Sequence, residues 1–154
     1  MLLLFHWLAK TWLAITLRDS TWAFAIIEII HLLALAVFGG AILILNLRFL
    51  GIGLKTQPSQ QVAQELFPAV LTGIGVMFVS GFLLLASGPM RYYYNPAFRI
   101  KMLLFFIAML IQILFQAKIT QQQEEWPMAQ KAFALLSLLL WLSIGLAGRA
   151  IGYV

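Results

Sequence analysis

The sequence has 154 residues, of which 63% are hydrophobic and 10% are charged. Soluble domains carry about 25% charged residues, and a water-soluble fold of this length has too small an interior to bury so much apolar surface. With its mean hydropathy of +0.97, the chain is expected to be a single domain that is dissolved in lipid.

The chain has a net charge of +5 and contains no cysteine. The lack of cysteine excludes disulfide bonds, cysteine-ligated zinc, iron–sulfur clusters and covalently attached c-type haem. The 10 basic residues are scattered and form no stripe, which argues against a nucleic-acid partner. In a membrane protein, such an excess of cations is expected in cytoplasmic loops or against anionic lipid headgroups.

Residues 1–18 predict an amphipathic helix that lies in the membrane interface. Phe5, Leu8 and Trp12 recur at helical spacing, and polar side chains flank this apolar stripe. Spanning is disfavoured because Lys10 would then lie in the middle of the membrane. The segment has neither the positively charged start nor the cleavage site of a signal peptide, so we expect it to be retained.

Four later segments are long and apolar enough to cross the hydrocarbon core, which needs about 20 residues of helix. They are predicted at residues 22–47, 67–87, 97–117 and 131–153. Asp19-Ser20-Thr21 supplies an N-cap for the first span, and Gly88-Pro89 ends the second because proline removes a backbone donor. Residues 1–154 are therefore predicted to be an all-α, integral membrane four-helix bundle with an N-terminal interfacial helix.

Polar connections are predicted between the spans. Residues 90–96 contain Tyr92, Tyr93 and Tyr94, which are expected at the depth of the lipid headgroups. Residues 118–130 contain a run of glutamines followed by two glutamates and are predicted to be an aqueous loop.

The distribution of cations predicts an orientation. Four spans place both termini on one side, which carries six basic residues: Lys10, Arg18, Arg91, Arg99, Lys101 and Arg149. The other side carries four: Arg48, Lys55, Lys118 and Lys131. Because cytoplasmic loops hold the excess of Lys and Arg, we expect the termini in the cytoplasm.

Ionisable residues inside a span indicate function, because each costs about 2.5 kcal/mol or more at the bilayer centre. Glu28 and His31 are three residues apart and share a face of the first span. At 1.5 Å per residue they lie about 9 Å and about 13 Å beyond Trp22. Lys101 enters the third span from the same side, so its long side chain can reach toward them. The sequence predicts a cluster of Glu28, His31, Arg99 and Lys101 in one leaflet.

Three interpretations of this cluster are open. In the first, Glu28 forms a buried ion pair with Lys101 or Arg99, and His31 forms a hydrogen bond with a neighbouring helix. In the second, the bundle binds b-type haem, which an inward histidine in a four-helix membrane bundle commonly ligates. Since His31 is the one histidine inside a span, the iron would take His31 alone, or His31 with the neutral amine of Lys101. Arginines near the same surface would then pair with the haem propionates.

The third interpretation is a metal site. Glu28-x-x-His31 is half of a di-iron motif, and copper would use the scattered methionines Met77, Met102 and Met109, which more often fill a core.

Three pairs of glycines and one tryptophan in the spans can each serve either helix packing or a second role. Gly148 and Gly152 have the spacing that lets helices pack closely, within the monomer or in a dimer. Gly39-Gly40 and Gly73-x-Gly75 serve packing or make room for a flat cofactor. Trp141 is expected to pack in the core or against a macrocycle.

Several motifs resemble those of small bacterial four-helix membrane proteins of uncharacterised function. In chain order they are Glu28-Ile29-Ile30-His31, Gly39-Gly40, Asn46-Leu47-Arg48-Phe49-Leu50-Gly51, Phe67-Pro68, Asn95-Pro96-Ala97-Phe98-Arg99-Ile100-Lys101 and Gly148-Arg149-x-Ile151-Gly152. The motifs cover nearly the full chain. The resemblance implies a protein of the bacterial inner membrane.

More distantly, the layout resembles the HemJ-type protoporphyrinogen oxidases and the membrane domains of the CopD type. The HemJ pattern has a histidine in its first span, a Leu/Arg pair that closes this span, and a lysine that opens the third. His31, Leu47-Arg48 and Lys101 stand at these places. The resemblance implies haem b binding by His31 and Lys101, and it adds Arg48 to the candidate cofactor-binding residues. The aromatic residues and further histidines of the HemJ pattern are missing here, so haem binding is better supported than the oxidation reaction.

The sequence therefore predicts a small membrane protein that binds b-type haem between its first and third spans and has an electron-transfer or haem-linked role. The alternative is a cofactor-free accessory subunit of a larger membrane complex or a homo-oligomer. No catalytic residue is predicted, and whether the protein is an enzyme is left open.

Overall fold

The computed structural model describes residues 2–53, 56–121 and 127–153, and these residues form helices, turns and short connections. The helices in chain order are α1 (Leu2–Ala9), α2 (Trp12–Asp19), α3 (Thr21–Leu50), α4 (Ser59–Ser87), α5 (Pro89–Tyr94), α6 (Pro96–Gln121) and α7 (Pro127–Ala150). The predicted all-α class is confirmed.

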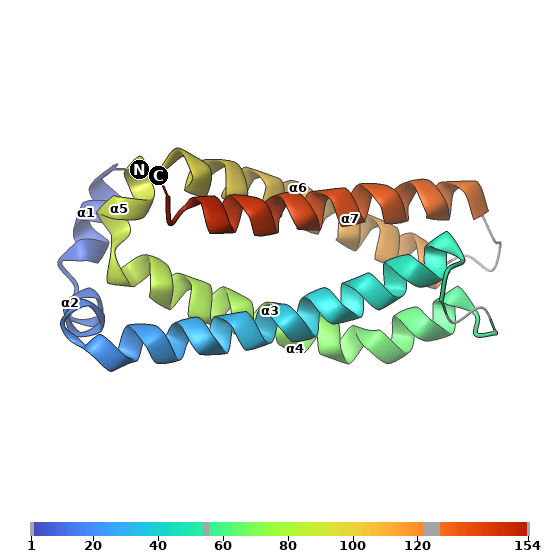
Figure 1. The fold of residues 1–154 in the computed structure, drawn as a ribbon, viewed down its shortest axis with the longest axis horizontal. Helices are drawn as coiled ribbons and strands as arrows, with labels where there is room; N and C mark the ends of the chain where they lie inside the picture. The colour runs from blue at the N-terminus through green and yellow to red at the C-terminus, as the bar shows by residue number, and fades with distance from the viewer. Residues whose placement is uncertain (1, 54–55, 122–126, 154) are drawn as a thin grey trace.

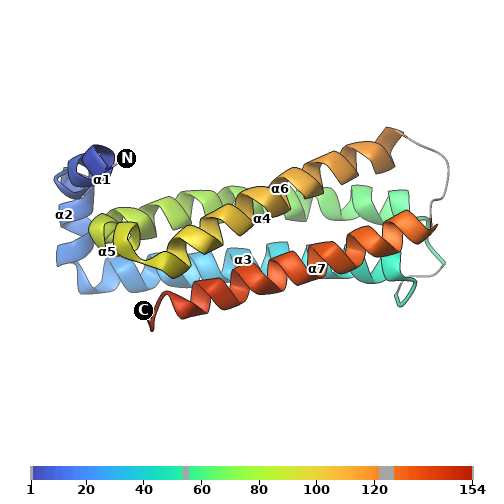
Figure 2. The same ribbon diagram turned by 90° about the horizontal axis from the view of Figure 1, so that it is seen from above.

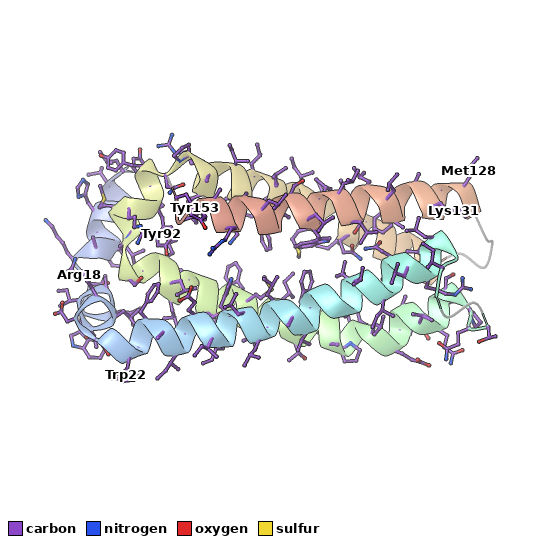
Figure 3. All side chains as sticks on the ribbon, viewed as in Figure 1. Arg18, Trp22, Tyr92, Met128, Lys131 and Tyr153 are labelled. Carbon is purple, nitrogen blue, oxygen red and sulfur yellow. The ribbon has the colours of Figure 1, made fainter. Side chains whose placement is uncertain are left out.

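Four helices, α3, α4, α6 and α7, are long and apolar enough to cross a membrane. Many large apolar side chains on their outer faces are exposed, among them Phe78 and Leu146, each 72% exposed. Figure 3 shows such side chains projecting outward along the whole length of the bundle. Soluble monomers rarely expose so much contiguous apolar surface, whereas a lipid bilayer accommodates it. We therefore describe the chain as a membrane protein whose outer surface contacts lipid.

The long helices form two pairs. α3 packs along α4, α6 packs along α7, and α3 also contacts α7. The short helices α1, α2 and α5 lie together at one end of the bundle, where both marked ends of the chain also lie (Figure 1). The same arrangement is visible from above, with the α6–α7 pair crossing over the α3–α4 pair (Figure 2). We call the end that contains α1, α2 and α5 the terminal end.

The best-packed part of the core lies toward the opposite end. One buried apolar cluster joins α3, α4 and α7, and its members are Leu45, Phe49, Val62, Ala63, Phe133 and Ala134. Near the middle of the bundle, the ring centroids of Phe38 and Trp141 are 4.7 Å apart. The packing role of Trp141 is thus confirmed. Toward the terminal end the two helix pairs separate in Figure 1.

The close approach of α3 and α4 depends on one glycine. A Cβ atom at Gly73 would lie 2.8 Å from Cβ of Phe38 and 3.0 Å from its backbone nitrogen. No side chain fits at this crossing without displacing the α3 backbone. In contrast, a Cβ atom at Gly39, Gly40 or Gly75 would meet no other atom within 4 Å.

The predicted single helix over residues 1–18 is wrong, because the segment forms two helices. α1 ends at Ala9, and Thr11 caps the start of α2 by accepting a hydrogen bond from the Ala14 backbone nitrogen at 3.3 Å. The capping threonine has an extended backbone conformation, which interrupts the helix. The N-cap predicted before the first span is confirmed, since Ser20 accepts a hydrogen bond from the Ala23 backbone nitrogen at 3.2 Å.

Several span boundaries also differ from the prediction. α4 begins at Ser59 rather than residue 67 and includes Pro68. Its polar first turns are stabilised because Val62 and Ala63 belong to the buried core cluster. Both ends of the loop predicted over residues 118–130 are helical, because α6 continues to Gln121 and α7 begins at Pro127; residues 122–126 lie outside the described residues.

The connection predicted over residues 90–96 is largely helical. Gly88 ends α4, as predicted, and Pro89 is the first residue of the short helix α5. Proline is favoured at this position because its fixed φ suits the first turn of a helix and its missing N–H would be unpaired there. At the other end of the chain, helix α7 ends at Ala150 and residues 151–153 form a turn.

Candidate functional site

The most informative polar contact inside a span joins α3 to α4. His31 Nδ1 lies 2.9 Å from Ser80 Oγ, and Ser80 Oγ donates a hydrogen bond to the Val76 carbonyl at 2.6 Å. A serine hydroxyl has one proton, and here that proton is used within α4. This arrangement favours the tautomer in which His31 Nδ1 carries the proton and donates it to Ser80 Oγ. In the neutral ring this leaves Nε2 with a free lone pair.

Small residues surround the His31 ring on α4. A Cβ atom at Gly81 would lie 3.3 Å from Cε1 of His31 and 3.7 Å from its Nδ1. Any larger residue at this position would push against a ring that the Ser80 hydrogen bond holds in place. The pair Ser80-Gly81 thus fixes the ring through one hydrogen bond and one close contact.

Lys101 of α6 lies at the same level of the bundle. Its amine is positioned over α7, where a Cβ atom at Gly148 would lie 3.2 Å from Nζ. Lys101 is half-buried and close enough to His31 for an electrostatic interaction between the two side chains. In the described part of the chain, no hydrogen bond or ion pair engages the Lys101 amine. The structure therefore brings His31 and Lys101 into one region, as predicted.

The other two members of the predicted cluster are placed differently. Glu28 is exposed on α3, near enough to His31 to interact electrostatically. Arg99 is exposed and donates two hydrogen bonds to the Tyr93 carbonyl, at 3.1 Å and 2.9 Å. Within the described residues neither Arg99 nor Lys101 forms an ion pair with Glu28. The first interpretation is therefore wrong about the ion pair, and its hydrogen bond between His31 and a neighbouring helix is confirmed.

A family model described as a family of unknown function, DUF6644, matches residues 4–154. The chain belongs to the DUF6644 family. No curated protein and no solved structure matches the chain. The predicted relation to a family of uncharacterised function is confirmed, and the more distant resemblance to HemJ and CopD stays a prediction.

In this DUF6644 member, Arg48 is far from His31. It lies seventeen residues later on α3, which is about 26 Å along the helix. Its Nε donates a hydrogen bond to the Gln57 carbonyl at 2.7 Å and thereby closes the turn between α3 and α4. A group bound by His31 and Lys101 would not reach Arg48.

Ser80 and Gly81 were not predicted as site residues. Both lie in the second predicted span, where their adjacent small and hydroxyl side chains are the signal in the sequence. Gly148 was assigned to helix packing, within the monomer or in a dimer, and the structure turns it inward against Lys101. Its partner in that motif, Gly152, lies beyond α7 in the terminal turn.

A second set of polar side chains in this DUF6644 protein is buried among α3, α6 and α7 and linked by hydrogen bonds. Asn46, only 1% exposed, donates from Nδ2 to Ser137 Oγ at 3.1 Å, and Ser137 donates to Gln112 Oε1 at 3.5 Å. The Asn46 Oδ1 atom is buried without a hydrogen-bond partner among the described residues. This chain of hydrogen bonds fixes how the α6–α7 pair docks on α3.

Metal-binding side chains are sparse in this family member. Over residues 2–53, 56–121 and 127–153, no group of three or more His, Asp or Glu side chains lies close enough together to hold a metal ion. A ligand at His31 would therefore need to bring most of its own coordination sphere.

Proposed function

We propose that this membrane protein binds one b-type haem near the terminal end of the bundle and uses it for electron transfer or a related redox role. The observation that carries the proposal is the hydrogen bond from His31 to Ser80. It favours the tautomer that presents the Nε2 lone pair, and histidine Nε2 is a common axial ligand of haem iron.

The surrounding residues fit a haem. An iron-ligating histidine is usually held by a hydrogen bond from its other ring nitrogen, and Ser80 accepts such a bond from His31. Lys101 offers a second nitrogen ligand at the same level, through its neutral amine. Gly81 and Gly148 have no Cβ atoms, so the His31 ring and the Lys101 side chain can pack directly against α4 and α7.

The chain and the cofactor have separate tasks in this proposal. A bound haem would supply one-electron exchange at its iron. Ser80 orients the His31 ring, Gly148 lets the Lys101 side chain lie along α7, and the apolar helices exclude water from the site. Arg48 is left out because it lies at the opposite end of α3.

The absorption spectrum tests the proposal. Protein purified from haem-replete cells is expected to show a Soret band and, after reduction, α and β bands. His31→Ala is expected to lose these bands. His6→Ala is the matched control, because His6 is an exposed histidine on α1 and its replacement should leave the spectrum unchanged.

Two results would overturn the proposal. A colourless wild-type preparation would favour the cofactor-free accessory subunit. Colour that persists in His31→Ala but is lost in Lys101→Met would show that His31 is not the principal ligand. If Lys101 is the second ligand, Lys101→Met should keep the colour and shift the bands.

We also propose that the terminal end faces the cytoplasm of a bacterial cell. Basic residues are more numerous there than at the opposite end, and cytoplasmic loops hold the excess of Lys and Arg. A reporter domain that is active only in the cytoplasm is expected to be active when it is fused after Val154. Activity of an alkaline phosphatase fusion, which requires export, would contradict this orientation.

A further inference from the structure

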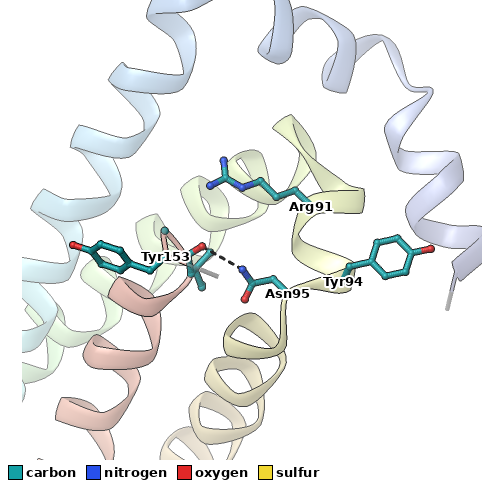
Figure 4. A pocket seen from close by; sticks show the side chains of 6 residues that line it. Arg91, Tyr94, Asn95 and Tyr153 are labelled. Carbon is teal, nitrogen blue, oxygen red and sulfur yellow. Dashed lines mark hydrogen bonds between the residues drawn. The ribbon is translucent and has the colours of Figure 1, made fainter.

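A pocket of about 310 Å³ lies at the terminal end, between α5, the start of α6 and the turn after α7. This volume is within the range of small-ligand sites, about 300–1,000 Å³. Figure 4 shows the Arg91 side chain extending over this region, with Tyr94 and Tyr153 on opposite sides. The lining residues are Arg91, Tyr94, Asn95, Ile151, Gly152 and Tyr153. None of them is acidic.

The floor of the pocket is ordered by Asn95. Its Nδ2 donates a hydrogen bond to the Ile151 carbonyl at 3.2 Å, and its Oδ1 accepts one from the Phe98 backbone nitrogen at 3.1 Å. Asn95 is buried. It thus ties the start of α6 to the turn after α7 and fixes the two sides of the pocket relative to each other.

Arg91 is the basic residue that lines this pocket, and it differs from two nearby arginines outside the pocket, whose donors are engaged. The guanidinium of Arg99 donates hydrogen bonds to the Tyr93 carbonyl and lies over the Tyr93 ring. Arg149 donates to the Tyr153 hydroxyl at 2.8 Å and lies over that ring. Arg91 is exposed, and its guanidinium forms no hydrogen bond or ion pair in the part of the chain that the structure describes.

We propose that this pocket binds the phosphate group of an anionic phospholipid. The guanidinium fork of arginine matches the geometry of phosphate oxygens and forms two charge-assisted hydrogen bonds with them. Tyrosines are enriched at headgroup depth, and basic pockets at the ends of membrane helices bind anionic headgroups. The pocket lies beside α5 at an end of the spans, which is the level expected for lipid headgroups. The two sources of such a phosphate are a lipid and the free ion.

Native mass spectrometry of the full-length protein, released from nanodiscs of mixed phosphatidylglycerol and phosphatidylcholine, tests the proposal. The wild-type protein is expected to retain phosphatidylglycerol in preference to phosphatidylcholine. Arg91→Gln should reduce the retained phosphatidylglycerol about tenfold, because the charge-assisted hydrogen bonds are lost. Arg18→Gln is the matched control: Arg18 is an exposed cation on α2, at the same end but outside the pocket.

The outcomes separate the alternatives. Equal retention of phosphatidylglycerol by wild type and Arg91→Gln would overturn the proposal, and so would an equal loss in Arg18→Gln, which would indicate general attraction to a basic surface. A large excess of inorganic phosphate is added in a further arm. If it displaces the lipid from wild type but not the residual lipid from Arg91→Gln, the phosphate site is supported. Retention of inorganic phosphate with no preference between the lipids would overturn the lipid as its source.

Discussion

His31 and Ser80, 49 residues apart in the sequence, lie 2.9 Å apart between ring nitrogen and hydroxyl oxygen. The contact joins α3 to α4 and favours the tautomer that is protonated at Nδ1. A histidine inside a span is costly, and here the cost is reduced by one hydrogen bond while the second nitrogen stays available to a ligand.

Ser80→Ala removes the group that orients His31. We expect the unfolding free energy in detergent to fall by about 0.6 kcal/mol, the average for hydrogen bonds between membrane helices. If haem is bound, its occupancy should also fall, because the ring is no longer held. Ser87→Ala is the control, since Ser87 donates only to the Leu84 carbonyl of its own helix. An equal effect of both variants on haem content would contradict the positioning role of Ser80.

Gly148→Ala changes the surroundings of Lys101. The added Cβ would lie 3.2 Å from Nζ, so the amine must shift. If Lys101 ligates haem, the reduced bands are expected to move in this variant, whereas Gly145→Ala should leave them in place because a Cβ there meets no atom within 4 Å. Unchanged bands in both variants would argue against Lys101 as a ligand.

Gly73→Ala tests the close crossing of α3 and α4. The new Cβ would meet Phe38 Cβ at 2.8 Å, and such overpacking costs about 1–3 kcal/mol. Thermal unfolding followed by tryptophan fluorescence should show a lower midpoint. Gly75→Ala on the same helix has free space and should be neutral or stabilising by up to about 1 kcal/mol. A lower unfolding midpoint for Gly75→Ala than for Gly73→Ala would contradict the placement of the close helix crossing at Gly73.

Asn46 and Ser137 are expected to show non-additive effects on stability. Ser137→Ala leaves the buried Asn46 amide without its partner and should cost about 1–3 kcal/mol. Asn46→Leu removes an atom that is already unpaired and should change stability by less than about 1 kcal/mol. The double variant should then cost less than Ser137→Ala alone. Ser143→Ala, whose hydroxyl donates only to the Leu139 carbonyl, provides the control for deletion of a hydroxyl on α7.

The hydroxyl of Tyr92 on α5 is expected to lose its proton at a higher pH than a free tyrosine. Burial raises the pKa of its hydroxyl above the usual 10.0, the nearby Glu28 raises it further, and Arg91 opposes the shift. Since the folded protein holds the proton more tightly than the unfolded chain, the stabilisation is complete below pH 10 and is lost as the pH rises through the higher folded pKa. Phenolate absorbance of wild type minus Tyr92→Phe should titrate above pH 10; a difference curve centred at or below this value would refute the shift.

The four spans and their approximate places followed from the sequence alone. Runs of about 20 apolar residues have one stable solution in a bilayer, because each backbone polar group must be paired within its own helix. The helix caps at Ser20 and Gly88 could also be predicted from the sequence, because capping depends on residues next to each other in the chain. Boundaries such as the start of α4 at Ser59 could not, since polar first turns form there only because Val62 and Ala63 are buried against other helices.

For the candidate site, the sequence determined which residues are costly, and the tertiary structure decided which of them meet. Glu28, His31, Arg99 and Lys101 were grouped by depth along their helices, which is a local quantity. The partners Ser80, Gly81 and Gly148 depend on the rotation and crossing of α3, α4, α6 and α7. Those are set by long-range packing, such as Gly73 against Phe38, and no local sequence pattern encodes them.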